Sequence, residues 1–193
     1  MRLYFIMVCM SFIMACSDIQ EQKSNNNVAA DSIAAAQPID SSHDTLAAAI
    51  NVTPKAVVNY AKTLIGIPYK YASTDPSQGF DCSGFITYVF NHFNIEVPRS
   101  SVDFTNAYPE VTTTNAREGD LILFTGTDSS DGVVGHMGII VSNMNDSIDF
   151  IHSTSGKTYG VTITPLNTYY KSRFVKIVRV LSQNGSVAIR RHF

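Results

Sequence analysis

Apolar residues at helical spacing fill the first part of the folded region, and short β-branched or aromatic runs fill the second. The helical pattern predicts one helix between Thr53, a good N-cap, and Gly66, a good stop. A second stripe begins at Cys82 and predicts a helix that ends near Asn94. The apolar positions that follow the cysteine on this stripe are Phe85, Ile86, Val89, Phe90 and Phe93.

Strand-like runs begin after Pro109, and turn residues separate them. The predicted strands are Leu121 to Thr125, Met137 to Val141, Ser147 to Ile151, Val161 to Ile163 and Phe174 to Val180. Helices first and strands second, with hairpin-length connections, predict an α+β fold. We therefore expect N-terminal helices packed on an antiparallel β-sheet or partial barrel.

The N-terminus has the features of an export signal. Arg2 precedes an apolar run, and Ala15 lies directly before Cys16. This resembles a bacterial lipobox, which implies a signal peptide over residues 1–15 and a lipid on Cys16. An ordinary secretory signal that is cut elsewhere is the alternative. Both interpretations place the protein outside the cytoplasm.

The next segment, residues 16–50, is predicted to be a flexible tether. Its composition is rich in Ser, Asn, Gln, Asp and Ala and has no aromatic residue, so it cannot bury enough apolar area to order itself. A single folded domain is expected over residues 51–181, followed by a polar tail at 182–193. The chain has 193 residues and a formal net charge of −2, so it has no basic excess for nucleic-acid binding.

Cys82 is the only cysteine predicted to lie in the folded domain, since Cys9 and Cys16 belong to the N-terminal region. It has no disulfide partner there, which raises the question of what the thiol does in an exported protein. At a helix start, unpaired N–H groups and the helix dipole favour the reactive thiolate. The alternative is that Cys82 is a small buried apolar residue.

Two histidines lie at the open end of one predicted hairpin. A turn centred on Met144 places His136 opposite His152. Strand alternation puts both on the same face as Gly138, and we expect this face to be the apolar one against which the cysteine helix packs. The Gly138 position would leave room for a close approach.

A thiol and two facing imidazoles form the layout of a nucleophile, a base and a group that orients the base. In this interpretation His136 takes the proton of the Cys82 thiol, and His152 holds the His136 ring in the right tautomer. The backbone N–H of Cys82 would help to stabilise the oxyanion.

These features resemble the NlpC/P60 family of cell-wall peptidases, which have a papain-like core. The matching segments are Pro68-Tyr69, Gly79 to Phe85, Pro98 to Ser100, Gly119 to Leu121, Phe124, His136 to Ile139 and Phe150 to Ser153. The resemblance implies that Cys82, His136 and His152 are the catalytic triad. It also implies that Tyr69 and Ser83 contribute to the oxyanion or substrate site. The chain departs from the family pattern at Ala72-Ser73 and in the long loop from Thr125 to Gly135.

The resemblance further implies a cysteine endopeptidase that hydrolyses peptidoglycan stem peptides, at D-γ-glutamyl–diaminopimelate or cross-link bonds. We expect no cofactor or metal, a monomer, and a lipid-anchored location in the cell envelope, at the outer membrane facing the periplasm. Three alternatives stay open at this point. They are a zinc site formed by the cysteine and the histidines, a non-catalytic cell-wall binding module, and amidase or transpeptidase chemistry on the same triad.

Overall fold

The computed structural model describes residues 52–127, 130, 132–145, 147–182 and 184–188. The predicted signal peptide, Cys16 and the whole of the tether lie outside the described residues, as does the end of the predicted tail. Within the described ranges, no helix is both long enough and apolar enough to cross a bilayer.

Two longer helices, α1 (Pro54–Thr63) and α2 (Cys82–Asn91), begin where the sequence predicts. Each has a side-chain cap: the Ala56 N–H donates to Thr53 Oγ1 at 3.1 Å, and the Gly84 N–H donates to Asp81 Oδ1 at 2.6 Å. The shorter helical turns are η1 (Ser101–Asp103), α3 (Phe104–Ala107), η2 (Thr113–Asn115) and α4 (Thr168–Lys171).

One sheet with strand order β3-β8-β4-β5-β6-β7 forms the centre of the domain, and each neighbouring pair is antiparallel. Its strands are β3 (Glu110–Val111), β4 (Leu121–Thr125), β5 (Val134–Met144), β6 (Ser147–Thr154), β7 (Gly160–Pro165) and β8 (Phe174–Val178). A separate ribbon pairs β1 (Thr74–Asp75) with β2 (Gly79–Phe80). The predicted α+β class is confirmed, and the sheet is open because β3 and β7 are not paired with each other.

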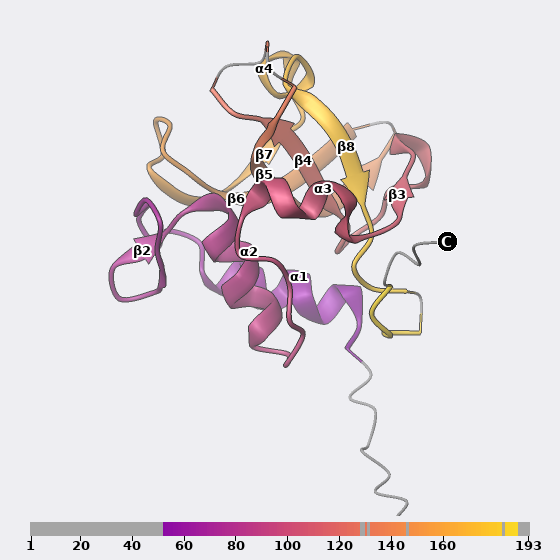
Figure 1. The fold of residues 1–193 in the computed structure, drawn as a ribbon, viewed down its shortest axis with the longest axis horizontal. Coiled ribbons are helices and arrows are strands. Elements are labelled where there is room, and N and C mark those ends of the chain that lie inside the picture. The colour runs from indigo at the N-terminus through magenta and orange to yellow at the C-terminus, as the bar shows by residue number, and fades with distance from the viewer. Residues whose placement is uncertain (1–51, 128–129, 131, 146, 183, 189–193) are drawn as a thin grey trace, which may run out of the picture. The chain divides into compact units, whose positions relative to one another are not determined.

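Both faces of the sheet are buried, and α1 and α2 lie on one side of it while α4 lies on the other (Figure 1). Leu121 and Leu123 of β4 pack with the helix core, whereas Ile122 and Phe124 pack in a second core that includes Tyr170 of α4. All five residues of β4 are therefore buried. A strand that is buried on both faces has no polar side, so the alternation of apolar and polar residues cannot indicate which side packs against the helices.

A bulge in β5 sets the orientation of the histidine hairpin. Near the tip Ser142 pairs with Asp149, but further along Ile140 pairs with Phe150, so Val141 is an extra residue. Without it, the register of the tip would put His136 and His152 on opposite faces of the sheet. The predicted pairing of His136 with His152 is wrong, because the observed register continues with Gly138 beside His152.

Candidate active site

Cys82 is the first residue of α2, and its thiol lies at the end of β5. Its Sγ is 3.8 Å from the carbonyl oxygen of Gly135, the residue before His136. Close packing holds the helix start in this place, since a Cβ at Gly84 would lie 2.1 Å from the Ser73 carbonyl oxygen. The Asp81 N–H donates to the same carbonyl oxygen at 3.1 Å. The loop before α2 thus fixes where the sulfur sits.

The free thiol is held in its neutral form. Burial raises the pKa of Cys82 above its ordinary value, and the Asp81 carboxylate adds to this rise. The N–H groups of Ser83 and Cys82 act in the opposite direction, as does Arg99, but they are outweighed. The N–H groups at the helix start do lower the pKa of Cys82, as predicted, but desolvation by burial is the larger effect and the net pKa is raised.

The two histidines are joined by a hydrogen bond of 2.8 Å between His136 Nε2 and His152 Nδ1. The other ring nitrogen of His152, Nε2, lies 3.0 Å from Thr164 Oγ1 on β7. His152 is fully buried, and Phe150 and Tyr170 pack against its ring. Since Nε2 of His136 is engaged by His152, Nδ1 is the ring nitrogen that remains for a proton from a thiol.

Both imidazoles are neutral at pH 7. Burial lowers the pKa of His136 well below its usual range, and His152 and Arg173 lower it further. The pKa of His152 falls to about 4, through burial first and then through the positive charge of Arg173. Thiol and base therefore begin as an uncharged pair, rather than as a thiolate and an imidazolium.

The histidines lie on the face of the sheet opposite to the one expected. His136 contacts Phe124, and His152 contacts Phe150, two residues of the core beneath α4. The prediction that they face the packing side of the cysteine helix is wrong, because both faces of this sheet are apolar. Cys82 instead lies beside the end of β5, where Cys82 and His136 line one cleft of about 820 Å³.

A second hollow, of about 520 Å³, begins on the other side of the thiol and shares Cys82 and Tyr69 with the first. Asp81 and Arg99 form a two-pronged ion pair there, with Arg99 Nη2 2.6 Å from Oδ2 and Nη1 3.1 Å from Oδ1. Ser83 Oγ accepts from Arg99 Nη1 at 3.0 Å. Ser83 lines this hollow together with Cys82, and its hydroxyl is hydrogen-bonded within the Asp81–Arg99 cluster.

Tyr69 lies where the sequence predicts, since it lines both hollows beside Cys82. Its backbone N–H donates to the carbonyl oxygen of Tyr159 at 3.1 Å. The rings of Tyr69 and Tyr159 pack edge to face, with their centroids 5.7 Å apart. Burial raises the pKa of its hydroxyl, followed by the effects of Cys82 and Asp81. The hydroxyl is thus protonated at neutral pH and can donate a hydrogen bond.

Three residues near the histidines were not identified from the sequence: Arg173, Tyr170 and Thr164. The Arg173 guanidinium is buried and donates to Tyr169 Oη at 2.6 Å and to the Thr125 carbonyl oxygen at 2.7 Å. Each of these residues reaches the site from more than ten positions away in sequence. Only the strand order, which brings β7 beside β6 and β8 beside β4, reveals their proximity.

The zinc alternative fits the geometry poorly. Nε2 of His136 and Nδ1 of His152 face each other at hydrogen-bond distance, so these two nitrogens are not directed at a common ion. Within the described ranges, no group of three or more His, Cys, Asp or Glu residues is placed to hold a metal ion.

Comparison with known proteins gives consistent matches. The gamma-DL-glutamyl hydrolase of Bacillus subtilis (strain 168) is 29% identical over 139 residues, covering 72% of this chain and 33% of that protein. The murein DD-endopeptidase MepS/murein LD-carboxypeptidase of Escherichia coli (strain K12) is 32% identical over 121 residues, covering 62% and 58%. The chain therefore spans from one third to somewhat over half of the length of these relatives.

The fold has solved counterparts as well. The crystal structure of an NlpC/P60 family protein from Bacillus cereus ATCC 10987 superposes with a TM-score of 0.59 at 30% identity, covering 67% of this chain and 40% of that one. The sequence profile of the NlpC/P60 family matches residues 66–179, which include the whole cysteine helix and both histidines. This chain belongs to the NlpC/P60 family.

Proposed function

We propose that this protein is a cysteine peptidase that hydrolyses peptide bonds in peptidoglycan stem peptides. Cys82 is the nucleophile, His136 the base and His152 the residue that orients the base. The observation that carries the proposal is that His136, held by a 2.8 Å bond to buried His152, lines the same cleft as Cys82. Membership of the NlpC/P60 family and the murein peptidase named among the relatives support the same substrate.

The reaction begins from the neutral pair. As the substrate carbonyl approaches, His136 Nδ1 takes the proton of the Cys82 thiol, and the sulfur forms a bond to the carbonyl carbon. The backbone N–H of Cys82 and the hydroxyl of Tyr69 donate to the oxyanion. The imidazolium then gives its proton to the leaving amine as the C–N bond breaks.

A thioester on Cys82 remains after the amine leaves. His136, again neutral, takes a proton from a water molecule that attacks the thioester carbon. Collapse of this second tetrahedral intermediate breaks the C–S bond, and the proton returns from His136 to the sulfur. His152 accepts a hydrogen bond from His136 Nε2–H throughout, which stabilises the transient imidazolium.

The charges of the cleft fit an acidic peptide. Lys157 and Arg173 line the hollow on the histidine side, and stem peptides carry free carboxylates. On the other side, the Asp81–Arg99 pair offers one group of each sign to the substrate. The two relatives bear names for different bonds, so the scissile bond is a separate question from the chemistry.

Muropeptide digestion tests the proposal. The purified full-length chain and its Cys82→Ala variant are incubated with a defined tetrapeptide–tetrapeptide dimer, and the products are identified by mass spectrometry. Hydrolysis by the wild type alone, with the mass of one water added, supports the proposal and names the bond. Equal products from both proteins would overturn it, and so would binding without turnover. Cross-linked products of higher mass would indicate a transpeptidase instead.

The location in the cell is a second part of this proposal. We propose that residues 1–15 are removed, that Cys16 carries a lipid and that residues 16–50 hold the domain away from the outer membrane. Cys16→Ser should release the protein from the membrane fraction and abolish incorporation of a radiolabelled fatty acid. Unchanged fractionation and labelling would contradict the anchor without affecting the catalytic proposal.

A further inference from the structure

We propose that Thr164 is a positioning residue of this site, because its hydroxyl fixes which nitrogen of His152 carries the proton. Thr164 lies on β7, and its Oγ1 is 3.0 Å from His152 Nε2. His152 in turn bonds His136 through Nδ1 at 2.8 Å. The inference rests on the proposed function, in which His136 must accept a proton from a thiol.

The proton positions follow from the bonds. His152 is neutral at pH 7, so it has one ring proton, which is on either Nδ1 or Nε2. A productive His136 has its own proton on Nε2 and donates it to His152, which leaves Nδ1 free for the thiol proton. Nδ1 of His152 must then be an acceptor, and its proton must be on Nε2. Thr164 Oγ1 consequently accepts a hydrogen bond from the His152 Nε2–H.

The same assignment holds after proton transfer. When His136 is an imidazolium, Nε2–H still donates to His152 Nδ1, so His152 keeps its proton on Nε2 and still donates to Thr164. If the Thr164 hydroxyl donated to Nε2 instead, His152 would be protonated on Nδ1. That would place the proton of neutral His136 on its own Nδ1 and block acceptance from the thiol.

The surroundings make the hydroxyl hard to replace. The ring of His152 is fully buried, so an Nε2–H that loses its partner pays the cost of a buried, unsatisfied donor. Thr164 itself is partly buried and lines the cleft, so its own hydroxyl proton can be donated to solvent or substrate. A threonine at this position can thus accept from His152 without leaving a buried polar group unpaired.

The test combines a tautomer measurement with kinetics on the full-length chain. In the wild type, two-bond ¹H–¹⁵N correlation spectra should show His152 protonated on Nε2. Thr164→Val keeps the side-chain shape and removes the hydroxyl, so the Nδ1–H form of His152 should appear. For muropeptide hydrolysis, kcat should fall by about 10- to 100-fold with little change in KM. Thr164→Ser, which retains the hydroxyl, should restore both the tautomer and the rate.

Thr74→Val is the matched control, because Thr74 is an exposed strand threonine in β1. It should change neither the spectrum nor the rate. Wild-type His152 protonated on Nδ1 would overturn the inference, even if Thr164→Val did not fold. A Thr164→Val protein with an unchanged tautomer, or with a changed tautomer and unchanged kcat, would overturn it as well. Because the spectra need no substrate, failure of peptidoglycan hydrolysis would be recognised separately.

Discussion

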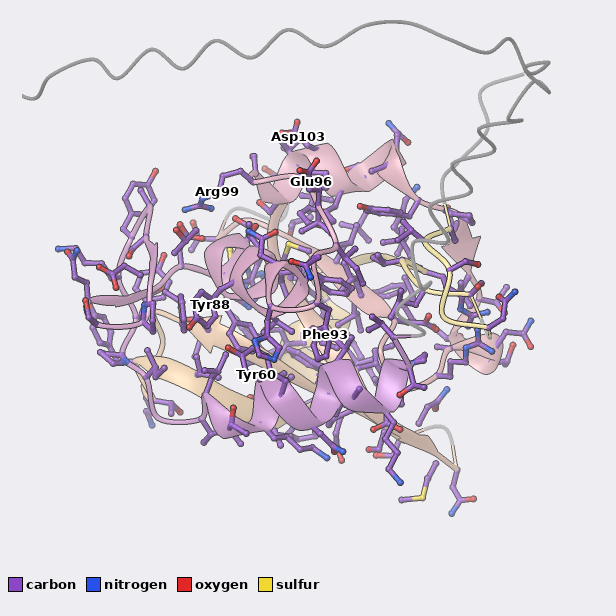
Figure 2. The ribbon with its side chains drawn as sticks, turned by 90° about the horizontal axis from the view of Figure 1, so that it is seen from below. Tyr60, Tyr88, Phe93, Glu96, Arg99 and Asp103 are labelled. Atoms are coloured by element: carbon purple, nitrogen blue, oxygen red, sulfur yellow. The ribbon has the colours of Figure 1, made fainter. Side chains whose placement is uncertain are left out.

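The two sides of Cys82 are built on different principles. On the histidine side, His136 and His152 are uncharged. Side-chain hydrogen bonds that link His136 on β5, His152 on β6 and Thr164 on β7 fix the two rings. On the other side, Asp81 and Arg99 are charged, and the Arg99 side chain is 44% exposed. Figure 2 shows Arg99 on the side of α2 away from Tyr60 of α1.

This difference assigns separate tasks to the two sides. A buried neutral imidazole has a defined tautomer and can accept a proton without first losing a bound water shell. The Asp81–Arg99 pair joins a buried carboxylate to a guanidinium that is partly exposed. The exposed guanidinium is screened by solvent and can exchange partners with a charged ligand. We therefore expect changes on the histidine side to lower kcat, and changes on the ion-pair side to raise KM.

The largest effect is expected for His136→Gln. Glutamine fills a similar space but cannot take the thiol proton, so kcat for muropeptide hydrolysis should fall by about 10³-fold, within the range for losing a general base. KM should change by less than a few-fold. Steady-state kinetics with circular dichroism as a fold control measure this. A variant that kept one tenth of wild-type kcat would show that His136 is not the base.

Gly138→Ala should destabilise the fold by crowding the residues that pack around His152. A Cβ at this position would lie 2.7 Å from the Phe150 ring, 2.9 Å from the Ile151 carbonyl oxygen and 3.2 Å from the His152 Cβ. We expect a loss of about 1–3 kcal/mol in the free energy of unfolding, the usual cost of overpacking. Urea denaturation measures it.

Gly126→Ala is the stability control for this experiment, since a Cβ there would meet nothing within 4 Å. Its unfolding free energy should stay within about 0.5 kcal/mol of the wild type, as for most uncrowded substitutions. If the two variants were equally stable, the packing around Gly138 would not be as close as the structure indicates.

Because His152 is buried and neutral, the free energy of unfolding is expected to fall at acidic pH. The folded pKa of His152 is about 4, below the unfolded value of 6.5, so the unfolded chain binds more protons between these two values. The contribution of His152 to the free energy of unfolding is therefore fully present above pH 6.5 and is lost as the pH falls towards 4. The loss amounts to about 3 kcal/mol for this one group.

Urea denaturation between pH 7.5 and 4 measures this loss, with His152→Asn as the comparison because asparagine does not titrate. The slope of unfolding free energy against pH should be steeper for the wild type than for the variant. Parallel slopes would mean that the ring is not held neutral. For catalysis, the lowered pKa of His136 places the acid limb of kcat/KM below pH 6.5.

The smallest effect on stability is expected for Arg99→Gln. Removing Arg99 should cost about 1 kcal/mol, because the buried Asp81 carboxylate keeps its hydrogen bonds from the Gly84 N–H and the Ser83 hydroxyl. KM for the stem peptide should rise, and kcat should stay within a few-fold. Lys176→Gln is the matched control, because it breaks the ion pair with Glu110 on the edge strand, which is 3.1 Å long. A fall in kcat as large as that of His136→Gln would remove the distinction between the two sides.

The sequence predicted those parts of the site that local patterns determine. Helix α2 begins at Cys82, as the apolar stripe predicts, and β4 runs from Leu121 to Thr125, as predicted. The two histidines were expected to lie together, and they do. The helix start and the strand follow from residues a few positions apart, where spacing rules apply, whereas the meeting of the histidines depends on the bulge at Val141.

The parts that were missed depend on contacts between distant segments. The bulge at Val141 has no glycine or proline to mark it, so the hairpin register was wrong. Alternation could not choose a face for His136, because the strands are apolar on both sides. The pKa of Cys82 depends on how deeply the sulfur is buried, which packing decides and helix position does not.

The central claim, that Cys82 performs the chemistry, is tested most directly by titrating its thiol against activity. The full-length chain with Cys9→Ser and Cys16→Ser is treated with limiting iodoacetamide, and the modified fraction of Cys82 is measured by peptide mass spectrometry. Residual muropeptide hydrolysis should fall in proportion to that fraction and reach zero at complete modification. Activity that persists in fully alkylated protein would contradict the account.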